Sequence, residues 1–145
     1  MKGMILALLT MLLALGGSAE ASEQIGNVKT LSGTAYVQRG DTQLRPALGD
    51  TLQVQDRVRT GADGSIGISF VDGTRLSLGP SSDVALRDYV FAPQENTFAF
   101  SLELLKGTAA YISGRLGKLS PDSVKIATPH VTIGIRGTSF ALKVN

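Results

Sequence analysis

Short runs of alternating apolar and polar residues set the strongest limit on the fold that this sequence can adopt. The runs 66–71 and 74–78 place large apolar residues at every second position, and Asp72-Gly73 joins them. Alternation with a period of two indicates β-strands with one buried face, and Asp-Gly between two such runs is typical of a tight hairpin. We therefore expect a two-residue type I′ turn in which both Asp72 and Gly73 have positive φ.

Further runs of this kind recur about every 8–10 residues through the centre of the chain, a spacing typical of sandwiches, barrels and β-rolls. The predicted fold is all-β: a single compact β-sandwich or β-roll-like domain of many short, mostly antiparallel strands. Gly61 and Gly64 mark an expected turn beside Asp63. Gly134 and Gly137 are expected either to allow close backbone approach or to relieve a bend. Later strands are expected at 98–105, 108–112, 124–127, 131–135 and 139–144.

Residues 1–21 have the layout of a secretory signal peptide. Lys2 precedes an apolar stretch at 4–15, and Ala19-Glu20-Ala21 places small residues where a signal peptidase cuts. We expect cleavage after Ala21, a periplasmic location in a Gram-negative bacterium, and one mature domain over residues 22–145. No second apolar stretch follows the leader, so the mature protein is not expected to span a membrane.

Composition argues against nucleic-acid binding and against catalysis. The formal net charge is only +2, from 14 Lys and Arg against 12 Asp and Glu, and the charges are scattered. The sequence has no Cys and a single histidine, His130, so it offers neither a thiolate nucleophile nor an ordinary zinc site. Asp50, Asp56, Asp63 and Asp72 lie beside or near glycines, which favours turns over a calcium site. We predict no enzyme activity, no metal and no cofactor.

Four blocks of sequence resemble the FecR domain family. They are DRVRTGADG at 56–64, FVDGTRLSLG at 70–79, LLKG at 104–107 and ATPHVTIGIRGTSF at 127–140, with GDTL at 49–52 before them. The resemblance covers about Gly26 to Val144 and implies a β-rich periplasmic domain. The best understood members of that family are membrane regulators, which pass a signal from an outer-membrane transporter to a cytoplasmic sigma factor. Because only a leader precedes the domain in this sequence, we expect binding or sensing in the periplasm and no anti-sigma role.

Arg115, Arg136 and Thr138, in or near the last block, are the candidate binding residues. An arginine guanidinium can grip a carboxylate or another anion with two parallel hydrogen bonds. A structural bond to an Asp or to turn carbonyls is an equally natural role, and 131–135 is expected to be a central core strand. The expected partner is another envelope protein, in a regulatory or signalling role. The alternative is a structural or binding protein for peptidoglycan or a small ligand.

Overall fold

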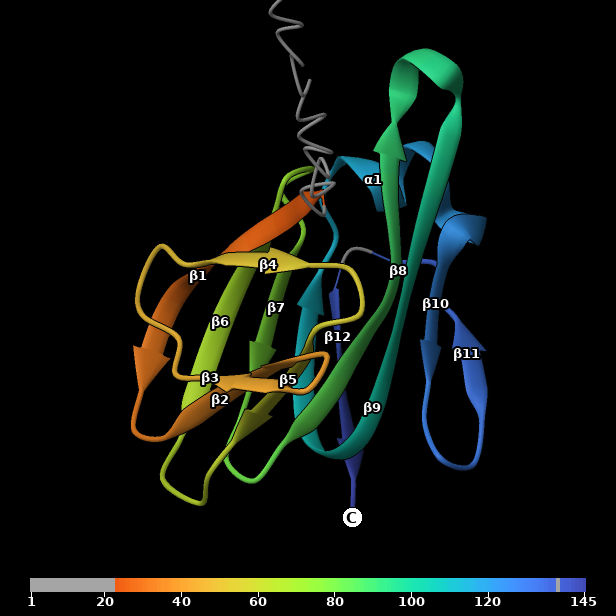
Figure 1. Ribbon diagram of the computed structural model, residues 1–145. Helices are drawn as coiled ribbons and strands as arrows, with labels where there is room; N and C mark the ends of the chain where they lie inside the picture. The colour runs from red at the N-terminus through yellow and green to blue at the C-terminus, as the bar shows by residue number, and fades with distance from the viewer. Residues whose placement is uncertain (1–22, 138) are drawn as a thin grey trace, which may run out of the picture.

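The computed structural model describes residues 23–137 and 139–145 and shows an all-β protein, which confirms the expected fold class (Figure 1). Within these residues twelve strands form one continuous hydrogen-bonded sheet, in which only the pairing of β9 (Thr97–Ile112) with β10 (Val124–Ala127) is parallel. The expected leader and Thr138 lie outside the described residues. No helix in the described part is both long and apolar enough to cross a membrane.

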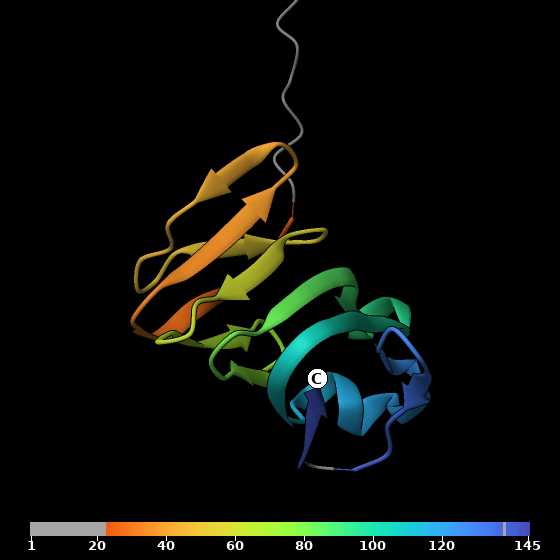
Figure 2. The same cartoon turned by 90° about the horizontal axis from the view of Figure 1, so that it is seen from below.

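The sheet curls back on itself, so that two layers enclose the core (Figures 1 and 2). The strand β9 belongs to both layers. Layer A also contains β4 (Thr51–Gln53), β1 (Gln24–Ser32), β6 (Ser65–Phe70), β7 (Arg75–Leu78) and β12 (Ser139–Val144). Layer B also contains β3 (Thr42–Leu44), β2 (Ala35–Arg39), β5 (Arg57–Thr60), β8 (Asp83–Ala92), β10 and β11 (Thr132–Gly134).

A single glycine lets β9 serve both layers. The sequence predicts two strands here, but the structure has one strand of 16 residues that bends at Gly107, where φ is +90°. Before the bend β9 pairs with β8 and β10, and after it with β7 and β12. A Cβ at this position would overlap the Oγ and Cα of Ser82. The side chain of Ser82 binds the bend itself, since its Oγ accepts from Thr108 N at 3.0 Å and donates to Thr108 O at 3.1 Å.

The core lies between two rows of apolar residues that face each other from the two layers. Residues on neighbouring strands occupy the same register position, so each row runs across the central strands of its layer on the side that faces the core. The row in layer B is Val37, Val58, Val84 and Leu104; the row in layer A is Val28, Ile68, Leu76, Tyr111 and Phe140.

Aromatic rings connect strands of both layers inside this core. The ring of Phe100 lies edge-on to Phe70 and Tyr111, at centroid distances of 5.2 and 5.6 Å. Tyr89 stacks on Phe70 at 5.3 Å, and Tyr111 stacks on Phe140 at 4.9 Å. Such pairs stabilise beyond the area that they bury.

The hairpin between β6 and β7 departs from the expected turn. Its loop has three residues, Val71, Asp72 and Gly73, because Phe70 N donates to Thr74 O at 2.8 Å and Gly73 N donates to Phe70 O at 2.9 Å. Only Gly73 has positive φ, at +89°. The turn is therefore the three-residue kind that ends on a left-handed glycine, not a type I′ turn. This difference turns the Asp72 side chain inward, where it is 3% exposed.

Near the C-terminus one further expectation is wrong, and the structure contains one element that the sequence did not predict. The segment 131–135 is not a central core strand: β11 pairs only with β10, and Val131 is 53% exposed. A short helix, α1 (Arg115–Leu119), lies where no helix is expected, since five residues including a glycine show no helical period. Two 3₁₀ turns, η1 (Pro93–Glu95) and η2 (Pro121–Ser123), complete the elements.

We predict that Gly107→Ala destabilises the protein more than Gly73→Ala. Both residues have φ near +90°, which costs a residue with a side chain about 1 kcal/mol or more. Only at Gly107 does the new Cβ also overlap neighbouring atoms, whereas Gly73 has open space around it. Urea unfolding should give a loss of about 1 kcal/mol for Gly73→Ala and at least about 2 kcal/mol for Gly107→Ala. Equal losses would contradict the assignment of the bend.

Candidate functional site

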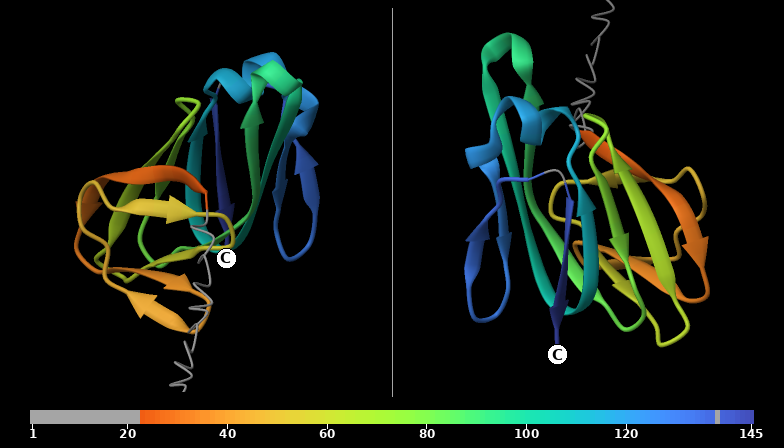
Figure 3. Two further views of the ribbon diagram at one scale, coloured as in Figure 1. Left: turned by 45° about the horizontal axis from the view of Figure 1, so that its top comes forward. Right: turned by 180° about the vertical axis from the view of Figure 1, so that it is seen from behind.

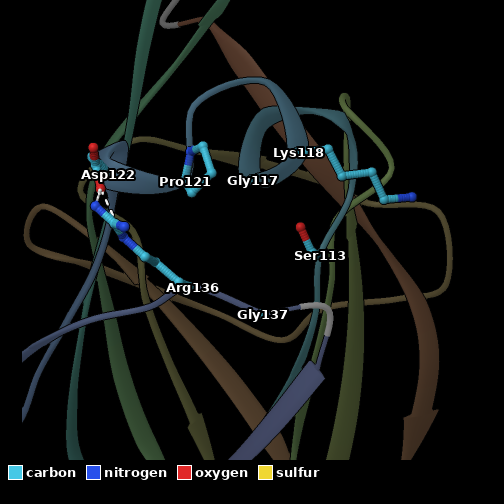
Figure 4. A pocket seen from close by; sticks show the side chains of 7 residues that line it. All are labelled: Ser113, Gly117, Lys118, Pro121, Asp122, Arg136 and Gly137. Atoms are coloured by element: carbon cyan, nitrogen blue, oxygen red, sulfur yellow. Dashed lines mark hydrogen bonds and ion pairs between the residues drawn. The ribbon is translucent and has the colours of Figure 1, made fainter.

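The candidate site is a cleft of about 440 Å³ between α1, η2 and the segment that leads from β11 to β12 (Figure 4). We call it the Arg136 cleft. Its charged groups come from three places in the sequence, because the two helical turns and the β11–β12 connection meet at one end of the curled sheet (Figure 3). The lining residues are Ser113, Gly117, Lys118, Pro121, Asp122, Arg136 and Gly137.

Arg136 is the group of this cleft best placed to recognise an anion. Its Nη2 donates to Asp122 Oδ1 at 2.6 Å and its Nε donates to the same oxygen at 3.1 Å. Both side chains are nearly 80% exposed, at 78% and 79%. An ion pair this exposed contributes about 0–1 kcal/mol. A carboxylate from outside can therefore replace Asp122 at small cost.

The wall formed by α1 depends on a buried carboxylate. Asp72 Oδ2 accepts from Leu116 N at 2.9 Å and its main-chain oxygen accepts from Arg115 N at 2.9 Å. These are amides of the first turn of α1, which lack partners inside the helix. Asp72 thus caps α1 from a residue more than forty positions earlier, in the way that an N-cap side chain does. The helix's own N-cap, Gly114, has no side chain with which to do this.

Two other side chains hold the same carboxylate, one from β8 and one from the residue just before β7. Tyr89 on β8 donates its hydroxyl to Asp72 Oδ1 at 2.7 Å. Thr74 donates its Oγ1 to Asp72 Oδ2 at 2.6 Å, and its own Oγ1 accepts from Gly114 N at 3.2 Å. We call Asp72, Thr74 and Tyr89 with the amides that they bind the Asp72 network. It ties the β6–β7 hairpin, β8 and α1 together, and all three of its side chains are buried.

Burial perturbs the two tyrosines of this region. Desolvation raises the pKa of Tyr89 well above its usual value, and the hydrogen bond to the Asp72 carboxylate raises it further. Desolvation also raises the pKa of Tyr111, while its hydrogen bond with Ser113 lowers it. Both phenols therefore remain protonated donors at neutral pH.

The structure separates the predicted binding residues. Arg136 lines the cleft, but Arg115 does not: its guanidinium carbon lies 5.3 Å from the ring centroid of Phe91 on β8. Thr138 lies outside the described residues. Lys118 also lines the cleft, and its side chain extends away from the Arg136–Asp122 pair (Figure 4).

Sequence reasoning missed the residues that shape this cleft. Asp122, Ser113 and Lys118 carry no motif, and only the tertiary fold brings them to Arg136. The inward direction of Asp72 was missed as well, because an Asp before a turn glycine is ordinarily exposed. In the structure Gly117 lets α1 lie close to the end of β9, because a Cβ there would overlap Ser113 Oγ.

The predicted turn glycines differ in how tightly they are packed. Gly61 N donates to Thr34 O at 2.9 Å, and a Cβ on Gly64 would overlap that same oxygen, so this turn requires close approach. A Cβ on Gly134 or Gly137 would meet no atom within 4 Å. Close backbone approach is therefore not the reason for these two glycines, although Gly137 leaves the cleft wall low.

Within the described part of the protein, no three His, Asp or Glu side chains gather in a way that could hold a metal ion. Two of the turn aspartates accept bonds from nearby groups instead. Asp50 accepts from Ala47 N at 2.8 Å, and Asp56 accepts two hydrogen bonds from Arg39, at 2.9 and 2.7 Å. His130 is exposed in the loop between β10 and β11.

Comparison with known proteins identifies a family. The family model described as FecR protein matches residues 56–145, a segment that contains Asp72, all of β9 and the whole Arg136 cleft. No curated protein and no solved structure matches the sequence.

We predict that Asp72→Asn destabilises the protein strongly and that Asp122→Asn does not. The amide introduced at position 72 would replace one acceptor oxygen by a donor and leave a buried N–H or hydroxyl unsatisfied. Thermal or urea unfolding should show a loss of about 2–4 kcal/mol. The exposed Asp122 serves as the matched control, with an expected change below about 0.5 kcal/mol. Similar losses at the two positions would refute the Asp72 network.

The raised tyrosine pKa values predict a loss of stability in alkali. In the unfolded state a tyrosine loses its proton near pH 10, while folded Tyr89 and Tyr111 keep theirs. The stabilisation is therefore complete below about pH 10 and falls as pH rises above it, by up to about 1.4 kcal/mol per pH unit for each phenol.

Tyr89→Phe should lower stability at pH 7, since Asp72 loses a donor, but it should flatten this alkaline decline. Urea unfolding at a series of pH values between about 7 and 11 measures both effects. A decline as steep as that of the unaltered protein would show that Tyr89 is not the group responsible.

Proposed function

Since the family model covers more than half of the sequence, the chain belongs to the FecR family, and we propose that it is an exported, non-catalytic module that binds another envelope protein through the Arg136 cleft. FecR proteins generally act as regulators in envelope signalling and not as enzymes. The expected leader supports a periplasmic location for the domain.

The observation that carries this proposal is the exchangeable partner of Arg136. The Arg136 side chain is 78% exposed, and the carboxylate that binds it is equally exposed. The N–H donors of its guanidinium therefore remain accessible from solvent. A planar guanidinium binds a carboxylate through two parallel hydrogen bonds, and this gives direction as well as affinity. The Asp72 network keeps the opposite wall rigid, so the cleft is formed before a partner arrives.

The composition of the cleft favours an acidic or turn-like segment of a protein partner. Arg136 and Lys118 supply two cations, while Pro121 and Gly137 add small, uncharged surfaces to the lining. The carboxylate of an Asp or Glu, or of a partner's C-terminus, fits the cations, and backbone carbonyls fit their remaining donors. The Arg136 cleft is too open for a small molecule to bury most of its surface in it. Sites for small ligands ordinarily bury most of the ligand's surface.

In-cell photo-crosslinking tests the proposal. A photoactivatable residue at position 118 or 121, both in the lining of the cleft, should capture one discrete envelope protein, while the same residue at Gln43 should not. Gln43 lies exposed on the edge strand β3, in the part of layer B farthest along the sheet from β10 and β11. Capture of the same species from Gln43, or no discrete protein from any cleft position, would contradict the proposal.

Charge reversal adds a matched comparison. With the probe kept at position 118, Arg136→Glu should reduce the captured protein by roughly tenfold, because a charge-assisted pair becomes a repulsive one. Arg45→Glu changes the charge equally on the exposed surface above Tyr36 and should leave the capture unchanged. Equal yields in the two variants would remove Arg136 from the interface.

A further inference from the structure

The outer face of layer A differs from an ordinary sheet surface in the size of its side chains. Register pairs place Thr30, Gly67, Ser77, Ala110 and Ala141 in one row across β1, β6, β7, β9 and β12. These five strands lie side by side in the view from behind (Figure 3, right). Four inter-strand spacings of about 4.8 Å make the row about 19 Å long. No member of the row is larger than threonine.

Larger side chains border the part of this row that lies on β1, β6 and β7 and turn it into a groove. In the neighbouring row Arg75 and Ile112 are register partners, and both are exposed. On β1 the register shifts between Val28 and Thr30, which places a bulge at Lys29 and leaves both Lys29 and Thr30 exposed on this side. The result is a hollow of about 510 Å³ that Lys29 and Arg75 flank and whose floor Gly67 and Ser77 form.

The two flanking cations form no ion pair with any carboxylate among the residues that the structure describes. All five ion pairs there involve other arginines. The outer face of layer B shows the contrast, since Arg57 binds Asp83 and Arg87 binds Glu103 on neighbouring strands. The groove therefore combines cations that lack a carboxylate with the hydroxyls of Thr30, Ser69 and Ser77.

We infer that this groove binds peptidoglycan, whose glycan strands offer hydroxyl groups and whose stem peptides offer carboxylates. Lys29 and Arg75 would bind the carboxylates, and the serine and threonine hydroxyls would exchange hydrogen bonds with the sugar hydroxyls. A flat bilayer cannot reach the floor of a hollow between two cations. A protein segment would want apolar pockets for its anchoring side chains, and Ile112 is the one large apolar side chain on the rim.

The inference rests on the periplasmic location given in the proposed function, but it concerns a different surface. The groove belongs to β1, β6, β7 and β9, and the Arg136 cleft to α1, η2 and the β11–β12 connection. The domain can hold the cell wall on one face and a protein partner at one end.

Co-sedimentation of the purified protein with peptidoglycan sacculi tests the groove. The unaltered protein should sediment with sacculi, and the double variant Lys29→Glu with Arg75→Glu should bind roughly tenfold more weakly. The matched control, Arg45→Glu with Lys106→Glu, makes the same change in net charge outside the groove, after β3 and on the part of β9 that pairs with β8, and should bind as the unaltered protein does. Ser77→Glu, an exposed substitution on the groove floor, should also reduce binding.

Two further binding measurements test whether the carboxylates of the sacculi are the groups that the groove recognises. Sacculi whose carboxylates have been converted to neutral amides should lose the protein, and vesicles containing phosphatidylglycerol should not bind it. No sedimentation with untreated sacculi, equal binding by the groove variant and its control, or preferential binding to the vesicles would each overturn the inference. The groove variant should still give the crosslinked protein from position 118, so failure here and failure of the cleft proposal remain distinguishable.

Discussion

The buried carboxylate of Asp72 is the interaction on which the candidate binding end of the protein depends. It accepts hydrogen bonds from Tyr89, from Thr74 and from the first turn of α1, and it is 3% exposed. An anion in the interior is stable only when donors surround it, and here those donors come from three separate parts of the sequence. The carboxylate therefore requires hairpin, strand and helix to be in place together. Because α1 forms one wall of the Arg136 cleft, the same hydrogen bonds hold that wall in place.

The periodic parts of this fold were predictable from the sequence, and its tertiary contacts were not. Alternation at 66–70 and 75–78 predicts strands because local pattern and burial agree there. The continuity of β9 through Gly107 was missed, since a glycine between two apolar runs ordinarily ends a strand. The type of the Asp72-Gly73 turn was also missed, because one extra loop residue leaves the sequence pattern unchanged while reversing the direction of the Asp72 side chain.

In the candidate site, too, one residue could be predicted from the local sequence, and its neighbours could not. Arg136 could be named from its block, because an arginine between two glycines near a strand end offers a free fork. Its neighbours Asp122 and Lys118 could not, since their positions follow from α1 and η2, which have no periodicity. The groove on layer A lay beyond sequence reasoning for a different reason. Small residues at one register position can be recognised as the floor of a groove only when the pairing of β1, β6, β7 and β9 is known.

The two layers of the curled sheet thus present surfaces of different kinds. Layer B has ion pairs between neighbouring strands, whereas layer A exposes a row of small side chains beside the cations Lys29 and Arg75. At one end, the cleft presents an arginine whose partner is readily replaced. These features fit a regulatory module that recognises other components of the envelope and contains its own rigid framework.

The central claim is that the Asp72 network builds a cleft that binds a protein partner. The most direct measurement is the yield of the crosslinked partner from position 118 in cells that carry Asp72→Asn, compared with Asp122→Asn, with circular dichroism showing that both variants are folded at the growth temperature. The account predicts that the partner is captured in the Asp122→Asn variant and lost in the Asp72→Asn variant, whose α1 has lost its cap. Undiminished capture in a folded Asp72→Asn variant would contradict it.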